Sequence, residues 1–125
     1  MGGAGAMTEI IDNLFVGDLR DAQAFDGLII CVLDEKPIDE PSNAVWMPFD
    51  IGTLDITASI IDHGLASDRR VLVHCGAGSE RAPLTIAWFL NRRREMSLDT
   101  AYDLLKRKRP IVRDRRSWLR QYLTQ

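Results

Sequence analysis

The chain has 125 residues, of which 46% are hydrophobic and 27% are charged, and its formal net charge at pH 7 is −2. This length and balance fit one soluble globular domain with a hydrophobic core, and the slightly acidic charge argues against binding of polyanions by composition alone. No apolar run reaches the ~20 residues that a membrane-spanning helix needs, and two cysteines cannot build a disulfide framework.

The first residues stand apart from the rest of the chain. Residues 1–6 are rich in glycine and alanine, so we expect a disordered or vector-derived start. Residues 7–125 hold no repeat and no long linker, and we expect them to form a single domain. Because no signal peptide is visible, we expect a cytoplasmic protein.

Short apolar runs alternate with amphipathic segments along the chain. The runs predict strands, and the continuous run at 28–33 is typical of a strand covered on both faces. The amphipathic segments predict helices, of which 83–93 is apolar nearly all round and should be central. This order predicts an α/β fold with a small, mostly parallel central sheet flanked by helices. The strands are expected at 14–16, 28–33, 45–47 and 71–73, and the helices at 18–25, 56–65, 83–93, 97–109 and 115–123.

The fourth predicted strand runs through His74 directly into Cys75, and a helix should begin near Arg81. The small residues between them allow successive backbone N–H groups to face one concavity, and such a nest at a helix N-terminus binds a phosphate dianion. Arg81 adds a planar fork of donors for two phosphate oxygens. The predicted phosphate-binding residues are Gly76, Ala77, Gly78, Ser79, Glu80 and Arg81.

The same nest favours the thiolate form of Cys75, and a thiolate is a strong nucleophile. Attack on phosphorus would give a phosphocysteine that water then hydrolyses. The N–H groups and Arg81 already stabilise charge on the transferring group, so we expect neither a metal nor another cofactor in this chemistry.

The run from His74 to Arg81 resembles the HCxxGxxR signature of the protein tyrosine phosphatase superfamily. Residues 10–22, 46–50 and 109–123 resemble the compact dual-specificity branch, so that the resemblance covers residues 9–123. Within that branch, residues 46–50 and 81–83 are most similar to the phosphatases of regenerating liver. The resemblance implies a cysteine-dependent phosphatase acting on phosphotyrosine, phosphoserine or phosphothreonine in proteins.

Three positions, 82, 51 and 80, depart from the family pattern. Ala82 replaces the serine or threonine that usually follows the arginine and supports breakdown of the phosphocysteine, which implies a slow second step. The usual general-acid position holds Ile51, so the leaving oxygen must find its proton elsewhere. We favour Asp50 as the general acid, with Asp55 and Glu80 as alternatives; Asp55 also suits a cap on a helix starting at residue 56. Glu80 lies inside the loop, where a carboxylate opposes phosphate binding, so we expect its side chain to point outward. It is a candidate acid because residues 79–83 resemble the loop of the cell-division-cycle phosphatases.

His74 and Cys31 receive supporting interpretations. A histidine directly before the nucleophile is more often a hydrogen-bonded core residue that orients the neighbouring backbone than a proton carrier. Cys31 lies within an apolar run and is interpreted as a buried thiol, with a resolving role toward Cys75 as the redox alternative.

Charge is distributed unevenly. Residues 92–120 hold eleven basic and four acidic residues, which indicates either solvated helix faces or a docking surface for an acidic or phosphorylated partner. We expect a phosphorylated protein or another phosphomonoester as substrate, a monomer, and no nucleic acid or membrane partner. The alternative function is a phosphate-binding module with weak or no turnover.

Overall fold

The computed structural model describes residues 6–120 and places five strands in one sheet, in the order β1-β2-β5-β3-β4. All neighbouring strands run parallel except β1 and β2, which form an antiparallel hairpin. The predicted α/β class with a mostly parallel central sheet is therefore confirmed. The strands are β1 (Thr8–Ile11), β2 (Leu14–Gly17), β3 (Leu28–Cys31), β4 (Val45–Trp46) and β5 (Val71–His74).

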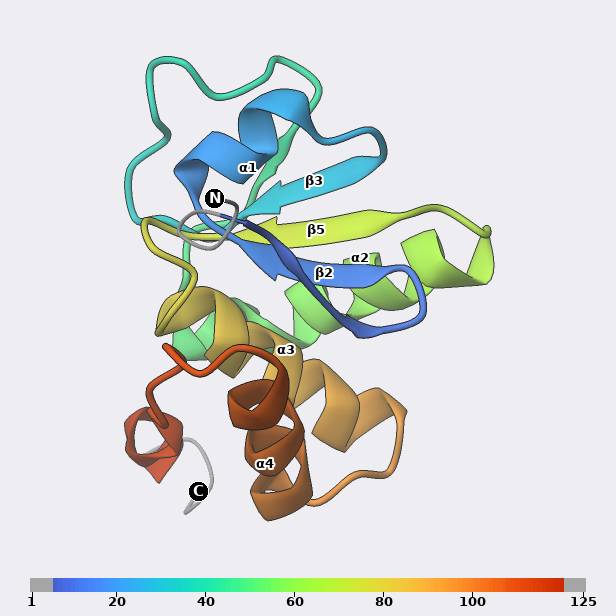
Figure 1. Cartoon of the computed structure of the whole chain (residues 1–125), viewed down its shortest axis with the longest axis vertical. Coiled ribbons are helices and arrows are strands. Elements are labelled where there is room, and N and C mark those ends of the chain that lie inside the picture. The colour runs from blue at the N-terminus through green and yellow to red at the C-terminus, as the bar shows by residue number, and fades with distance from the viewer. Residues whose placement is uncertain (1–5, 121–125) are drawn as a thin grey trace.

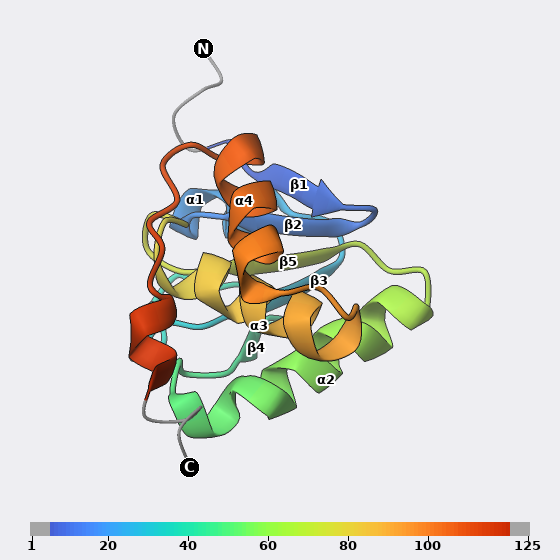
Figure 2. The ribbon, with the colours of Figure 1, turned by 90° about the horizontal axis from the view of Figure 1, so that it is seen from below.

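Helices cover both faces of the sheet (Figures 1 and 2). One face carries the short helix α1, and the other carries the three longer helices α2, α3 and α4. Within residues 6–120, none of the helices combines the length and apolar character needed to cross a bilayer. The helices are α1 (Leu19–Ala24), α2 (Leu54–Ala66), α3 (Arg81–Arg93) and α4 (Leu98–Lys108), with 3-10 turns η1 (Ile51–Thr53) and η2 (Arg116–Leu119).

Successive side chains of the central strands point to opposite faces of the sheet, and each face has its own hydrophobic core. Leu28, Ile30, Val71 and Val73 pack toward the three long helices, whereas Ile29 and Leu72 join a smaller cluster under α1. Since successive strand residues point to opposite faces, a strand buried on both sides must be apolar throughout. The apolar strands β3 and β5 therefore suit the interior of the sheet. The candidate site lies at their carboxyl ends.

Helix α3 is the central helix, as its sequence predicts. Every residue from Ala82 to Leu90 is buried, and α3 packs between α2 and α4. Ser97 caps α4 by accepting a hydrogen bond from the Thr100 N–H, and α4 ends before Pro110. Buried packing therefore positions α3, whose N-cap residue Glu80 makes no side-chain capping hydrogen bond.

Four local predictions were wrong. The first predicted strand lacked its hairpin partner β1, which turns back at Asn13 with a φ of 70°. Helix α2 begins at Leu54 with Thr53 at its N-cap, so Asp55 is no cap. The spacing of Ile56, Ile60, Ile61 and Leu65 predicts one shared apolar face on this helix, but Ile56 is exposed.

The end of the chain also differs. Within the helix predicted at 115–123, residues 116–119 form a 3-10 turn and residue 120 is helical, while residues 121–123 lie outside the described residues. Trp118 is exposed and packs edge-on against Phe49, with ring centroids 6.1 Å apart. Leu119 is buried, as expected. The expected inward positions of Tyr122 and Leu123 lie outside the described residues, as do residues 1–5.

Candidate active site

The candidate site lies at the carboxyl edge of the sheet. Because β2, β5, β3 and β4 are parallel, the segments that follow them meet at this edge. Open α/β sheets bind ligands at such edges. The segment after β5 is the predicted phosphate loop, residues 75–80, which runs directly into α3.

One buried arginine ties down the outer side of the loop. Arg109, at the end of α4, donates from Nε to the Gly78 carbonyl at 2.9 Å and from Nη2 to the Ala77 carbonyl at 3.2 Å. Its Nη1 donates to the Thr8 hydroxyl at 2.9 Å and so links the loop to β1. Sequence reasoning assigned no role to Arg109, although an arginine that is 6% exposed must spend its donors on buried acceptors.

Two more loop carbonyls are bound from outside. The Leu19 N–H donates to the Gly76 carbonyl at 3.3 Å, and the Arg113 N–H donates to the Ser79 carbonyl at 2.8 Å. In a planar trans peptide the carbonyl and the following N–H point in opposite directions. Each tied carbonyl therefore turns the next N–H toward the inside of the loop, which is the arrangement that binds an anion.

Gly78 is needed for this shape. Its φ is +69°, and a Cβ there would stand 2.6 Å from the Gly17 carbonyl oxygen and 2.9 Å from Arg109 Nη2. A side chain at this position would be strained and would push the loop away from the residues that hold it.

Cys75 and Arg81 lie at the two ends of the loop. Cys75 is 4% exposed, and its Sγ accepts a hydrogen bond from the Ala82 N–H at 3.4 Å. The sulfur therefore faces the N-terminus of α3, where unpaired N–H groups and the helix dipole favour negative charge. The Arg81 side chain is partly exposed and contacts the Asp34 carboxylate at 3.3 Å. Asp34 is a neighbour of the site that the sequence did not indicate.

His74 is fully buried at the end of β5. Its Nε2 lies 2.8 Å from Glu40 Oε2, and its Nδ1 lies 3.3 Å from the Cys75 carbonyl oxygen. Glu40 comes from the long connection between β3 and β4, and no pattern in the sequence indicates that this glutamate is buried. The position of His74 fits a residue that orients the backbone of the nucleophile.

The favoured general acid, Asp50, has a local partner. Asp50 Oδ2 accepts a hydrogen bond from the Gly52 N–H at 2.9 Å and thereby caps η1. Among residues 6–120, no hydrogen bond joins Asp50 to the phosphate loop. Asp50 lies on the segment after β4, at the same edge of the sheet as Cys75.

The two alternative acids are held by other contacts. Asp55 Oδ1 accepts a 2.7 Å hydrogen bond from the indole N–H of the buried Trp88, across the interface of α2 and α3. Glu80 accepts hydrogen bonds from Arg115, and these, together with the nearby guanidinium charges, lower the pKa of Glu80 below its usual value. A carboxyl with a lowered pKa is ionised at neutral pH, which makes Glu80 a poor proton donor.

Comparison with protein families gives an independent finding. Residues 51–125 match the family model described as dual specificity phosphatase, catalytic domain. The chain is 39% identical to human dual specificity protein phosphatase 16 over 133 residues, which cover 93% of this chain and 20% of that protein. It is 36% identical to human dual specificity protein phosphatase 9, with 92% of this chain and 35% of that protein covered. The chain therefore spans well under half the length of either relative.

Solved structures show the same fold. Human DUSP28 superposes with a TM-score of 0.81 at 21% identity, covering 94% of this chain and 90% of that one. The human tyrosine phosphatase-like serine/threonine/tyrosine-interacting protein superposes with a TM-score of 0.78 at 18% identity, with 94% and 93% covered.

Proposed function

This chain belongs to the dual specificity phosphatase family, and from that premise we propose that residues 7–125 form a phosphatase domain that hydrolyses phosphomonoesters on tyrosine, serine or threonine of proteins. Cys75 is the nucleophile, Arg81 and the loop N–H groups bind the phosphate, and His74 orients the Cys75 backbone. The observation that carries this proposal is the set of four loop carbonyls bound from outside, because it turns the loop N–H groups inward.

The reaction follows from these contacts in two steps. The Cys75 sulfur attacks phosphorus, the phosphorus–oxygen bond to the substrate breaks, and the leaving oxygen takes a proton from a carboxylic acid. Water then attacks the phosphocysteine, which releases inorganic phosphate and restores the thiolate. The inward N–H groups and Arg81 stabilise the charge of the transferring group in both steps.

Asp50 remains the preferred proton donor. The contacts of Asp55 with Trp88 and of Glu80 with Arg115 give both alternatives structural roles. Asp50 needs only to exchange one exposed hydrogen bond with Gly52 for one with the leaving group. Closure of a loop on the bound substrate is a common way to complete such a site.

The substrate class and compartment follow from the same chemistry. We propose that the site admits several kinds of phosphoresidue, as in the family, and that the chain acts as a monomer on phosphorylated proteins. Both cysteines are free thiols, and a nucleophilic thiolate needs a reducing compartment. We therefore propose that the enzyme works in the cytoplasm.

A phosphate-binding module with little turnover is the second candidate. Ala82 places a methyl group where a hydroxyl would support the second step, and each of the three candidate acids accepts a hydrogen bond from another part of the chain. These observations favour firm phosphate binding with slow release of the covalent phosphate.

Steady-state hydrolysis of para-nitrophenyl phosphate tests the two candidates. The wild-type protein should turn over, and Cys75→Ser should lose activity by about 10³-fold or more while it still binds phosphate and unfolds at a similar temperature. Retention of more than about a tenth of the activity in Cys75→Ser would exclude the nucleophilic mechanism. Binding without turnover in the wild type would favour the module.

A further inference from the structure

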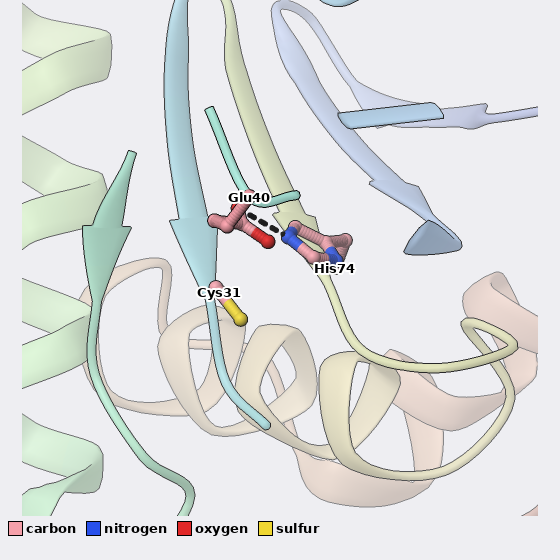
Figure 3. Close-up of side chains that lie close together, drawn as sticks. All are labelled: Cys31, Glu40 and His74. Carbon is pink, nitrogen blue, oxygen red and sulfur yellow. Dashed lines mark hydrogen bonds and ion pairs between the residues drawn. The ribbon is translucent and has the colours of Figure 1, made fainter. Parts of the chain in front are cut away.

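A second cluster of reactive side chains lies behind the catalytic loop. The Cys31 thiol at the end of β3, the Glu40 carboxylate and the His74 imidazole at the end of β5 converge on one space (Figure 3). Their donor atoms all lie within 4.8 Å of one another, and all three residues are buried. In the proposed mechanism, Cys31 and Glu40 have no role.

The Glu40 carboxylate is the unusual member of this cluster. Its side chain is 0% exposed, its Oε2 contacts His74, and its Oε1 has no hydrogen-bond partner in the described part of the chain. The neighbouring Cys31 thiol offers this carboxylate only a weak hydrogen bond, so its lost solvation is poorly replaced and its burial is costly. The unpaired oxygen faces a thiol and an imidazole, which are both metal ligands.

We propose that Cys31, Glu40 and His74 form a binding site for a divalent transition metal ion of the zinc class. The three side chains supply three ligands, namely a thiolate sulfur, an imidazole nitrogen and a carboxylate, and a water molecule would take the fourth position of a tetrahedral shell. Thiolate, imidazole and carboxylate together suit zinc. One thiolate and one carboxylate also balance the charge of a dication, so the occupied site would be neutral in the core.

The surroundings fit a metal site in a second respect. A histidine that binds metal through one ring nitrogen commonly donates from the other to a backbone carbonyl, which fixes the ring. His74 Nδ1 lies 3.3 Å from the Cys75 carbonyl oxygen, so its Nε2 is the nitrogen that faces Glu40. Zinc bonds of about 2.0–2.3 Å put donor atoms roughly 3.3–3.8 Å apart. Small rotations of the three side chains would therefore bring their donor atoms, which now lie within 4.8 Å of one another, to the spacing that zinc requires.

Metal binding requires that protons leave. Burial raises the pKa of the Cys31 thiol to about 11, and the nearby Glu40 charge adds to the rise. On binding, the metal–sulfur bond replaces the sulfur–hydrogen bond, the metal–nitrogen bond replaces the hydrogen bond between His74 and Glu40, and both protons pass to solvent. Burial disfavours an isolated thiolate, and the dication supplies the charge that the thiolate lacks.

The site is distinct from the phosphate loop, and the proposal does not depend on the proposed function. All donors are buried, so the ion would hold the ends of β3 and β5 together and would not meet substrate. Glu40 belongs to the 34–44 connection, which has no helix or strand. A local opening of that connection would admit the ion. Sequence reasoning predicts no metal in the phosphatase chemistry and interprets Cys31 as a buried thiol, so it does not predict this site.

Cobalt titration tests the proposal directly. Co²⁺ bound by a thiolate in tetrahedral geometry gives a thiolate-to-cobalt charge-transfer band and visible absorption bands that Zn²⁺ abolishes by competition. We expect the bands in the wild type and in Cys75→Ser, because the catalytic sulfur is not a ligand. We expect the charge-transfer band to disappear in Cys31→Ser. We also expect Glu40→Gln to bind at least about tenfold more weakly.

Controls separate this site from the catalytic cysteine and from misfolding. Glu35→Gln, an exposed glutamate on the same connection, should bind as the wild type does. Zn²⁺ should raise the unfolding temperature of the wild type and Cys75→Ser but not of Glu40→Gln. If Cys31→Ser does not fold, the near-isosteric Glu40→Gln decides. Absence of binding after long equilibration, full affinity in a folded Glu40→Gln, or loss of the bands in Cys75→Ser alone would each overturn the proposal.

Discussion

The phosphate loop and the acid-bearing segment after β4 reach the same edge of the sheet but are held in different ways. In the loop, four carbonyls are bound from outside, two of them by the buried Arg109, and Gly78 has the positive φ that this shape requires. In the segment after β4, the exposed carboxylate of Asp50 accepts a hydrogen bond only from Gly52 of its own turn, among the residues that the structure describes. In the proposed mechanism, the phosphate-binding groups are therefore preorganised, whereas Asp50 must move to donate its proton.

The fold therefore prepares the site for stabilising the transferring phosphoryl group more than for donating a proton to the leaving group. Preorganised N–H groups and a helix N-terminus stabilise charge without rearrangement during the reaction. Proton donation requires that Asp50 exchange its partner. We expect variants of the loop to lose nearly all activity, and variants of the acid segment to lose activity in proportion to the substrate's need for a proton.

Arg81 should show the largest effect, because it is the loop's only charged donor to the phosphate. Arg81→Ala should lower kcat/KM by about 10³-fold or more, while Arg81→Lys, which keeps the charge but loses the planar fork, should recover part of it. Both are measured with the same aryl phosphate, and circular dichroism checks the fold. Equal activity in Arg81→Ala and the wild type would show that the loop binds phosphate without its arginine.

Replacement of Asp50 should slow hydrolysis by an amount that depends on the leaving group. Asp50→Asn should slow hydrolysis of phosphotyrosine by roughly 10²-fold and hydrolysis of a highly activated aryl phosphate far less, because only the poorer leaving group needs the proton. The basic limb of the pH profile should flatten, since that limb reports loss of the acid's proton.

Asp55→Asn and Glu80→Gln are the matched controls for Asp50, and the variant that shows the leaving-group dependence identifies the acid. If none of the three shows it, the enzyme works without a general acid, and the binding module becomes the better account of the chain.

Arg109 tests whether the tied carbonyls matter. Arg109→Leu should raise KM for the aryl phosphate and lower the free energy of unfolding by about 1.5–3 kcal/mol, because buried carbonyls lose charged donors. Arg107→Leu, an exposed basic residue of the same helix, is the control. An unchanged KM in a folded Arg109→Leu protein would mean that the loop keeps its shape without this clamp.

Ala82 should give the smallest effect. Ala82→Ser restores a hydroxyl beside the Cys75 sulfur, and a hydrogen bond worth about 0.5–1.5 kcal/mol predicts a steady rate roughly 2–10-fold higher. Rapid-mixing kinetics with an aryl phosphate separates the first turnover from the steady rate. A burst followed by an unchanged steady rate would show that breakdown of the phosphocysteine is not limited by this position.

The sequence predicted the loop well because the loop is local. The apolar strand, Cys75, the small residues and Arg81 are contiguous, so their order alone implies the nest. Arg109, Asp34 and Glu40 were missed because each reaches the site from a distant part of the chain, and only packing brings it there. The α/β class followed from the alternation of strands and helices, while β1 was missed because its four residues show little alternation.

Trapping the covalent intermediate tests directly whether Cys75 is the nucleophile. The wild-type protein is mixed with an aryl phosphate, quenched in acid within the first turnover and digested, and the peptides are examined by mass spectrometry. We predict phosphate on the peptide that contains Cys75, none on that peptide in Cys75→Ser, and more at steady state in the wild type than in Ala82→Ser. Turnover without phosphate on Cys75, or phosphate on another residue, would contradict the account.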